Sequence, residues 1–359
     1  MINISIIFQI MNIKDIKINL KPLRYLDVIK GKYVYNKCIH INDGIIEKIN
    51  DKGSGLNLEG ITLIPGLIDT HVHITYHFPW EKKDGIKNNQ MKTLNAGFTT
   101  IRDLGSEKIV EVLDDDFSPN IIWAGKPIFK KDLKNKSIKD NLKERINSEA
   151  IKIFESKNNL ISLKDLKEIV KTSTVPVAIH AIHPEEVEIA SASGCRSIEH
   201  CSYIDKFHFN KNTYVCPTFS NPSQYLNNFN QYDYMFKDNM QEVKKYFEGI
   251  RDNNVQNISK IYPKAKLVFG TDSVAGMHGN NHYEFNFLKK LGLSNIEMIR
   301  LATIDAAEML MIDNLGIIEE GCYADIIGVI GDPLKDINDL SNIVFVMKNG
   351  TIFVFKDEE

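Results

Sequence analysis

Short apolar runs alternate with stretches of helical periodicity through most of the chain. Such alternation predicts a parallel β-sheet whose strands are joined by crossover helices. The helical stretches include residues 162–172 and 184–194, and the second closes on a glycine that is typical of a helix C-terminus. The apolar runs predict eight strands, at residues 62–73, 99–103, 120–125, 150–154, 175–180, 196–200, 213–217 and 267–272. Eight such units form an α/β fold of the (β/α)8 TIM-like barrel type, whose active site lies at the carboxyl ends of the strands.

The two ends of the chain have a different pattern. Residues 12–60 and 320–359 contain short alternating runs, and Asn349-Gly350 is a strong signal for a hairpin turn. We therefore expect a small β-sandwich domain built from both termini, with residues 61–319 forming the barrel. The first residues are apolar but lack the basic stretch and cleavage site of a signal peptide, so the start is open between Met1 and Met11.

The composition limits the class of protein. A chain of 359 residues with 43% hydrophobic content can bury a large core. Its net charge of −3 leaves no basic surplus for phosphate groups, so we expect no nucleic-acid partner. No apolar run reaches the roughly 18 residues of a membrane span, so no membrane association is expected. The five cysteines form no CxxC pair, which favours a reducing, cytoplasmic location over a disulfide framework.

Polar side chains interrupt the predicted strands at one end. His71 and His73 are two residues apart at the end of the first strand, so both should face the barrel mouth. The other members of the set lie in the fourth, fifth, sixth and eighth strands: Lys152, His180, His200 and Asp272. Imidazole and carboxylate are common ligands of zinc and similar divalent ions. Packing alone would favour Val, Ile or Leu at such positions, so the pattern predicts an open, catalytic metal site.

The chain resembles the amidohydrolase superfamily, in its imidazolonepropionase-like and prolidase-like branch. The resemblance covers residues 33–356, and its motifs occur in the expected order. The motifs are LIPGLIDTHVH (63–73), NAGFTTIRDLG (95–105), AIKIF (150–154), VPVAIHA (175–181), GCRSIEHCSYID (194–205), VFGTDS (268–273), ATIDAAEML (302–310) and GIIEEGCYADIIGV (316–329).

This resemblance implies a binuclear metal centre, with zinc as the expected ion. It implies two sets of ligands: His71, His73 and Asp272 for the more buried ion, and His180 and His200 for the more exposed one. Lys152 would bridge the ions as a carbamate, because a lysine beside two cations has a lowered pKa and its carbamate is an anionic ligand. A hydroxide held between the ions would then attack an amide bond. Asp272 would be the catalytic residue that carries a proton to the departing nitrogen.

Three positions depart from relatives or need separate interpretation. Many deaminases of the superfamily have a glutamate three residues after the fifth-strand histidine, where this chain has His183. Glu199 is another glutamate that could serve a deaminase, but we expect it to point toward the helices, because its neighbour His200 should face the metals and side chains alternate along a strand. Arg102 lies near the end of its predicted strand, by the barrel rim, and is open to a functional role, but the favoured expectation is that it pairs with a neighbour such as Asp103.

The segment between the third and fourth strands is short. In prolidase-like relatives this segment contains a Gly-Gly-His-Gly-like element that helps to bind the substrate carboxylate. In this chain the segment is residues 126–149, and the element is missing from it. Either another group binds the carboxylate, or the substrate has none there. Further candidates for substrate contact lie in the strand-to-helix loops, namely Tyr76, His77, His183, Tyr225, His278 and His282.

These features together predict a metal-dependent hydrolase acting on C–N bonds. The expected reaction is cleavage of an amide bond in a dipeptide or an N-acyl amino acid, so the expected partner is a small molecule or short peptide. The alternative is a cyclic amidine hydrolase or a deaminase of the imidazolonepropionase-like type. A scaffold with a decayed site is disfavoured because every ligand position holds a competent residue. A homo-oligomer is left open.

Overall fold

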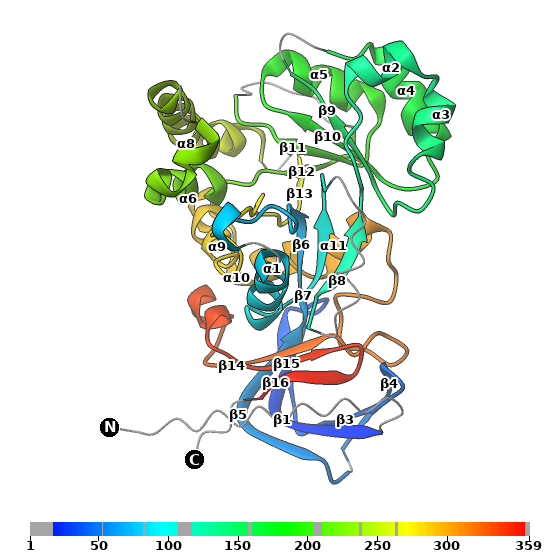
Figure 1. The fold of residues 1–359 in the computed structure, drawn as a ribbon. Helices are drawn as coiled ribbons and strands as arrows, with labels where there is room; N and C mark the ends of the chain where they lie inside the picture. The colour runs from blue at the N-terminus through cyan, green and yellow to red at the C-terminus, as the bar shows by residue number, and fades with distance from the viewer. Residues whose placement is uncertain are drawn as a thin grey trace.

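The fold combines a mixed sheet from the two ends of the chain with parallel strands between them (Figure 1). The computed structural model describes residues 17–51, 53–81, 84–106, 117–156, 160–203, 210–236, 239–262 and 265–355. The question of the start at Met1 or Met11 lies outside these ranges. Among the helices in these ranges, none has the length and apolar character needed to cross a membrane.

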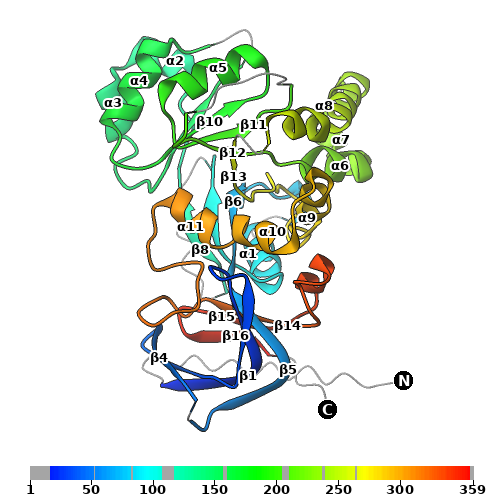
Figure 2. The ribbon, with the colours of Figure 1, turned by 180° about the vertical axis from the view of Figure 1, so that it is seen from behind.

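The mixed sheet has eight strands in the order β16-β15-β14-β5-β1-β3-β4, with β2 beside β1. Its members are β1 (Ile18–Asp27), β2 (Lys32–Tyr35), β3 (Cys38–Asn42), β4 (Ile45–Asn50), β5 (Leu56–Pro65), β14 (Ile326–Ile330), β15 (Ile343–Lys348) and β16 (Thr351–Phe355). β14 pairs with β5, so the N-terminal strands (blue) and the C-terminal strands (red) share one sheet at the same end of the molecule (Figures 1 and 2). β1 and β5 run parallel, whereas the other pairs are antiparallel.

Local turn chemistry and a separate core stabilise this terminal sheet. Asn349 and Gly350 have φ values of 49° and 75°, and they connect β15 to β16. Positive φ at both central residues defines the turn that fits the twist of a hairpin, so the predicted hairpin is confirmed. Leu20, Ile39 and Phe345 are fully buried in a cluster of apolar side chains that belongs to this sheet.

The parallel strands form two sheets. One has the order β6-β7-β8 and the other β13-β12-β11-β10-β9. Their bounds are β6 (Leu67–Val72), β7 (Phe98–Asp103), β8 (Asn120–Trp123), β9 (Ile151–Phe154), β10 (Val177–Ala181), β11 (Ser197–His200), β12 (Tyr214–Cys216) and β13 (Lys266–Leu267). Each of the eight predicted strands therefore contains or overlaps one of these parallel strands.

Backbone hydrogen bonds connect the two parallel sheets at both margins. Beside β8 and β9, the Ile128 N–H donates to the Lys152 carbonyl at 2.8 Å. Beside β6 and β13, the Thr70 N–H donates to the Phe269 carbonyl at 3.1 Å. The arrangement is a TIM-barrel-like α/β fold in which the carboxyl ends of the strands meet.

Two predicted strands have different limits in the structure. Residues 62–73 form the end of β5 and all of β6, so this prediction of one continuous strand is wrong. Gly66 lies between the two strands, where a Cβ atom would come within 2.2 Å of Thr99 Oγ1. The lack of a side chain thus allows the chain to pass from one sheet to the other. In the predicted strand 267–272, the regular strand β13 includes only Lys266–Leu267.

Helices follow most of the parallel strands. They are α1 (Asp84–Asn95), α2 (Lys130–Asn135), α3 (Ile138–Lys143), α4 (Leu163–Thr172), α5 (Pro184–Ser193), α6 (Ser220–Asn227), α7 (Asp233–Phe236), α8 (Met240–Ile261), α9 (Tyr283–Leu288), α10 (Asn295–Leu301) and α11 (Ile304–Leu310). Helices α2 to α5 gather near β9 and β10, at the end of the molecule opposite the terminal sheet (Figure 1). The predicted helices at 162–172 and 184–194 are confirmed. Ser162 caps α4 by accepting the Asp165 N–H, and Gly194 ends α5 with φ 80°.

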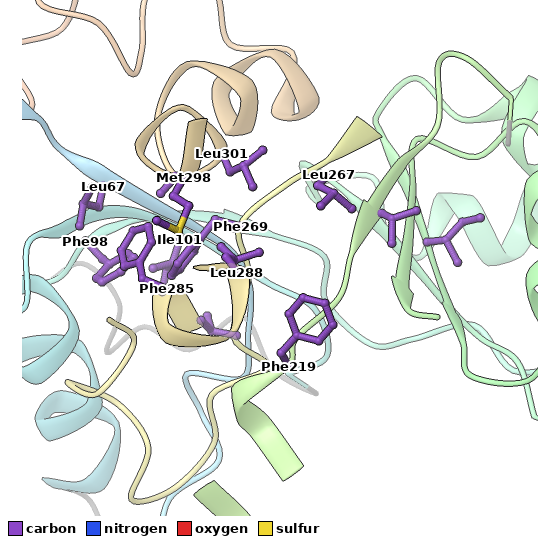
Figure 3. Packing of buried hydrophobic residues seen from close by; sticks show 14 of the residues in the cluster. Leu67, Phe98, Ile101, Phe219, Leu267, Phe269, Phe285, Leu288, Met298 and Leu301 are labelled. Carbon is purple, nitrogen blue, oxygen red and sulfur yellow. The ribbon is translucent and has the colours of Figure 1, made fainter. Parts of the chain in front are cut away.

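Aromatic and aliphatic side chains from distant segments form the main core. Figure 3 shows Phe98 of β7 and Leu67 of β6 next to Phe269, which follows β13, and Phe285 of α9. The ring centroids of Phe98 and Phe269 lie 5.5 Å apart, and those of Phe269 and Phe285 lie 4.7 Å apart. This packing fixes the segment after β13 against β6, and both segments carry residues of the site described next.

Candidate metal centre and active-site cavity

The six side chains predicted from the strand ends line a single cavity of about 290 Å³. They are His71, His73, Lys152, His180, His200 and Asp272. Four of them come from β6, β9, β10 and β11, His73 directly follows β6, and Asp272 lies in the segment after β13. Because parallel strands bring their carboxyl ends together, residues far apart in the sequence meet at this position.

Asp272 faces the two histidines of the first motif. Its Oδ1 atom lies 3.4 Å from His71 Nε2 and 3.1 Å from His73 Nε2. The Asp272 N–H also donates to the His71 carbonyl at 2.7 Å, so the backbone holds the carboxylate against the end of β6. The three side chains therefore point their potential ligand atoms at one place.

His180 and His200 form the neighbouring part of the cluster. Their ring centroids lie 4.5 Å apart, and the His200 ring lies 5.1 Å from that of His71. The His180 ring stacks on Phe154 at 4.1 Å, and His200 Nδ1 lies 2.8 Å from Thr218 Oγ1. Ligand atoms of His71, His200 and Asp272 lie within 4.8 Å of one another. These contacts orient the two rings toward the cavity.

Lys152 is a buried lysine with no compensating ion pair in the described part of the chain. Its Nζ atom has no hydrogen-bond partner there, and the side chain is almost wholly buried. Burial lowers the pKa of this amine because it disfavours the charged form. The structure thus places an amine with reduced basicity next to the imidazoles and Asp272.

The chemistry of the donors fits a divalent metal ion. Burial lowers the pKa values of His71, His180 and His200 well below the ordinary value, so these rings are neutral at pH 7. Burial acts to raise the pKa of Asp272, but its interactions with His71 and His73, which include a hydrogen bond from His73, outweigh burial and the net shift is downward. Like Lys152 Nζ, the buried His71 Nε2 atom has no hydrogen-bond partner among the described residues. Neutral imidazoles, a carboxylate and orphaned nitrogen atoms are what a cation site requires.

Glu199 lies inside the strand layer, so the prediction that it points toward the helices is wrong. Its Oε2 atom lies 2.8 Å from His71 Nδ1, and its Oε1 atom accepts a hydrogen bond from Arg102 Nη2 at 2.9 Å. Burial favours the neutral acid, but the charges of Arg102 and Lys152 outweigh it and lower the pKa of Glu199. A carboxylate at this position holds the His71 ring by Nδ1 and directs Nε2 toward the cavity.

The backbone explains why Glu199 and its neighbour His200 both serve the site. Glu199 lies beside His180 in the pairing of β10 with β11, so the two share one face. His200 has φ 78°, in the left-handed region, and this breaks the alternation of side chains at the end of β11. Asp272 is also left-handed, with φ 55°. Such conformations concentrate at functional sites.

Arg102 also differs from its expected pairing. It does not bind Asp103, whose carboxylate accepts hydrogen bonds from Ser106 and from the Ile74 N–H. Arg102 is fully buried, and besides Glu199 it donates to the Thr70 carbonyl at 2.6 Å. Its guanidinium therefore supports the residues beneath the cluster rather than the rim.

The model of the Amidohydrolase family matches residues 62–353. The chain belongs to the amidohydrolase family. This result confirms the predicted superfamily and the predicted class of enzyme, a hydrolase that acts on C–N bonds. Members of the family generally use divalent metal ions, which agrees with the donor set of the cluster. A search of curated proteins finds no significant match to this chain.

Solved structures with prolidase names share the fold of this amidohydrolase. A Xaa-Pro dipeptidase with bound methionine aligns with a TM-score of 0.80 at 23% identity, over 94% of this chain and 100% of that chain. A prolidase in complex with N-methylphosphonate-L-proline gives 0.80 at 20% identity, over 95% and 100% of the two chains. A putative prolidase from Bifidobacterium longum gives 0.78 at 22% identity, over 96% of each.

Of the expected substrate contacts in this amidohydrolase, Tyr225 and Tyr76 line the cavity. The histidines among them have other partners and are not among the described residues that line it. His77 Nδ1 lies 3.0 Å from the Phe78 carbonyl. His183 precedes the first residue of α5, and its ring stacks on that of Tyr203. His278 is buried behind the cluster, with Nδ1 3.0 Å from Thr93 Oγ1, and His282 Nε2 lies 2.7 Å from the Ala96 carbonyl.

Several lining residues were not predicted from the sequence. They are mostly apolar or aromatic: Leu104, Pro127, Phe129, Phe154, Tyr232, Tyr234, Met235 and Val274. Phe154 was accessible to prediction, because it lies two residues after Lys152 on the same strand and so shares its face. Tyr234 and Met235 lie on α7, and no local pattern connects that helix with the metal ligands.

Proposed function

We propose that this amidohydrolase is a binuclear metal-dependent enzyme that cleaves an amide bond in a dipeptide or an N-acyl amino acid. One observation carries the proposal. Four histidines, an aspartate and a buried lysine line one cavity, and the lysine Nζ has no hydrogen-bond partner among the described residues. Packing alone does not explain a lysine in that position, because an unpaired buried amine is unfavourable.

The ligand assignment follows the resemblance stated above. The proposed ligands are His71, His73 and Asp272 for the more buried ion, and His180 and His200 for the more exposed one. Lys152, as a carbamate, would be a ligand of both ions, with zinc as the proposed metal. The short distances from Asp272 to both histidines of the first motif support the first group. The close rings of His180 and His200 support the second.

Bound divalent ions supply Lewis acidity and a nucleophilic water at neutral pH. The protein side chains supply position and proton transfer. Asp272 is a carboxylate whose pKa is lowered by His71 and His73, so it is ionised and can accept a proton from the attacking water. It then delivers this proton to the amide nitrogen, which is otherwise a poor leaving group. Tyr225, which lines the same cavity, is the proposed substrate contact.

Metal analysis tests the binuclear proposal. We expect close to two divalent ions per chain after reconstitution with zinc and bicarbonate. Lys152→Ala should lose one ion and most of the activity, and added short-chain carboxylates should restore part of it. A consistent value of one ion or none in the wild-type protein would contradict the binuclear centre. Unchanged metal content in Lys152→Ala, without rescue, would make Lys152 a structural residue.

A cyclic amidine hydrolase or a deaminase remains the second candidate. His183 stands where many deaminases have a glutamate, and its ring stacks on Tyr203 rather than lining the cavity. This placement favours amide cleavage. Release of ammonia, instead of a free amino acid, from the best substrate would support the second candidate.

The finer organisation is also part of the proposal. We infer a closed (β/α)8 barrel at 61–319, and a small β-sandwich domain from 12–60 and 320–359. The backbone bonds at both margins of the parallel sheets support the first, and the separate apolar cluster supports the second.

The five cysteines are free and buried, which suits the expected cytoplasmic location. A small-molecule or short-peptide partner fits the cavity, and homo-oligomerisation is to be tested by light scattering.

A further inference from the structure

Beside the cluster of ligands, two groups of aromatic side chains line the cavity, and we call them its aromatic walls. On one wall the rings of Phe129 and Phe154 lie 5.4 Å apart. On the other wall the rings of Tyr225 and Tyr232 lie 4.6 Å apart, and Tyr234 lies nearby. These walls come from β9, α6 and α7 and from the segments beside them. Both groups of rings line the same cavity as the candidate ligands.

Charged groups are scarce in this cavity. Among the described residues that line it, the Lys, Arg, Asp and Glu side chains are Lys152 and Asp272, and both belong to the ligand cluster. The Tyr232 hydroxyl donates to the Ala275 carbonyl at 2.7 Å, so its polar end is already engaged. Within the described part of the chain, no second carboxylate lines the cavity to pair with a substrate ammonium group.

We propose that the substrate group held between the aromatic walls is uncharged and apolar. The inference rests on the proposed amidase function and narrows it to N-acyl amino acids with an aromatic or long aliphatic acyl group. A free dipeptide has its α-ammonium group on the carbon next to the scissile carbonyl. That ammonium group enters the cavity whenever the carbonyl approaches the ligand cluster.

Two opposing physical effects determine whether an ammonium group binds in such a cavity. A positive charge over an aromatic ring is attracted to its face, but this attraction recovers only a small part of the hydration that the charge loses. An apolar group loses no comparable hydration and instead gains about tenfold to a hundredfold in affinity when it is buried. The balance favours an uncharged group.

A matched pair of substrates tests this inference. Phenylalanyl-leucine and 3-phenylpropanoyl-leucine have the same ring, the same scissile bond and the same leaving amino acid, and they differ only in the α-ammonium group. With the metal-loaded full chain, we expect kcat/KM to be at least about tenfold higher for 3-phenylpropanoyl-leucine. Equal values, or a preference for the dipeptide, would overturn the inference.

Variants of the walls locate the effect. Phe129→Ala should lower kcat/KM for 3-phenylpropanoyl-leucine about tenfold, mainly through KM, and should leave acetyl-leucine nearly unchanged. Tyr234→Ser is a second variant, from the other group of aromatic residues, in case Phe129→Ala unfolds. Tyr323→Ser changes an exposed tyrosine that does not line the cavity, and it serves as the matched control. Equal losses for both substrates in both wall variants would overturn the assignment.

A binding experiment separates failure of this inference from failure of the proposed function. If the metal-loaded protein cleaves neither substrate, the proposed amide cleavage is wrong. Calorimetric titration of the full chain with 3-phenylpropanamide and with phenylalaninamide then decides the inference, because the two probes differ only in the ammonium group. Binding at least tenfold tighter for the uncharged probe supports it. Equal binding, or tighter binding of phenylalaninamide, contradicts it.

Discussion

At the scale of single residues, a buried chain of polar groups lies beneath the candidate ligands. Arg102 donates to Glu199, and Glu199 lies 2.8 Å from the Nδ1 atom of His71. Ser197 Oγ also donates to Glu199, at 2.5 Å. An ionised carboxylate behind a histidine fixes its ring and its tautomer, which raises the affinity of the other nitrogen for a metal.

Glu199→Gln tests this chain. The variant keeps the size of the side chain but loses the charge that pairs with Arg102 and that holds the Nδ1 proton of His71. We expect the affinity for zinc to fall about 10–100-fold, measured by competition with a chelator on folded protein. Glu297→Gln, at an exposed position of α10, is the control. Unchanged affinity in Glu199→Gln would mean that the carboxylate does not position His71.

Asp272 gives the second prediction at this scale. Asparagine keeps the shape and one ligand oxygen but cannot carry the proton to the departing amine. We expect Asp272→Asn to lower kcat by about two orders of magnitude or more, with a much smaller change in KM. Metal content must be measured in parallel and should be largely retained. A variant with near-full kcat would show that another group moves the proton.

At the scale of elements, the connection from β8 to β9 shapes one side of the cavity. It contains the short helices α2 and α3, and Pro127 and Phe129 at its beginning line the cavity. Arg145 near its end is committed to the carbonyls of Lys126 and Asn141. Arg145, the arginine of this connection, is therefore engaged with the backbone, and no basic residue of the described part of the connection lines the cavity.

Because this connection offers no free basic group to the cavity in the described part of the chain, we expect the enzyme to distinguish only weakly between substrates with and without a carboxylate. Replacing the carboxylate of an N-acyl amino acid with a carboxamide should lower kcat/KM far less than about 10³-fold, a factor that equals roughly 4 kcal/mol of transition-state stabilisation. The comparison uses 3-phenylpropanoyl-leucine and its amide. A loss of that size or more would reveal a carboxylate-binding group elsewhere in the cavity.

The sequence predicted the elements with a local signature better than those that depend on distant contacts. The strand ends and the hairpin at Asn349-Gly350 follow from period-two patterns and turn residues. The orientation of Glu199 could not be predicted, because it depends on the left-handed backbone of His200 and on the pairing of β10 with β11. The aromatic wall from α6 and α7 likewise depends on where the chain folds, not on any local motif.

At the scale of the whole molecule, buried carboxyl groups make stability depend on pH. Glu284 on α9 is fully buried and accepts the backbone N–H groups of Phe219 and Ser220 at the start of α6. Burial raises the pKa of this carboxyl from 4.5 to about 7. The folded state therefore binds the proton more tightly than the unfolded state does. The stability from this group is fully present below pH 4.5 and is lost as the pH rises through about 7.

Glu284→Gln should flatten this dependence. Between pH 5 and pH 8, the free energy of unfolding of the wild-type protein should fall more than that of the variant, by a difference of up to roughly 3 kcal/mol. Urea unfolding at both pH values gives the comparison. Glu188→Gln, at an exposed position of α5, is the control and should follow the wild type. Parallel curves for all three proteins would show that Glu284 titrates normally.

The sheet shared by both ends of the chain has a consequence for biosynthesis. β5 pairs with β14, and Leu63 lies opposite Gly328 in this pair. This edge of β5 therefore has no hydrogen-bonded neighbour until Gly328 has been synthesised. During translation, β1 to β5 emerge first and expose an apolar edge while the whole parallel-strand region is still being made. Such late closure slows folding and leaves the nascent chain open to aggregation. We therefore expect this edge of the N-terminal strands to stay unpaired until β14 has been synthesised.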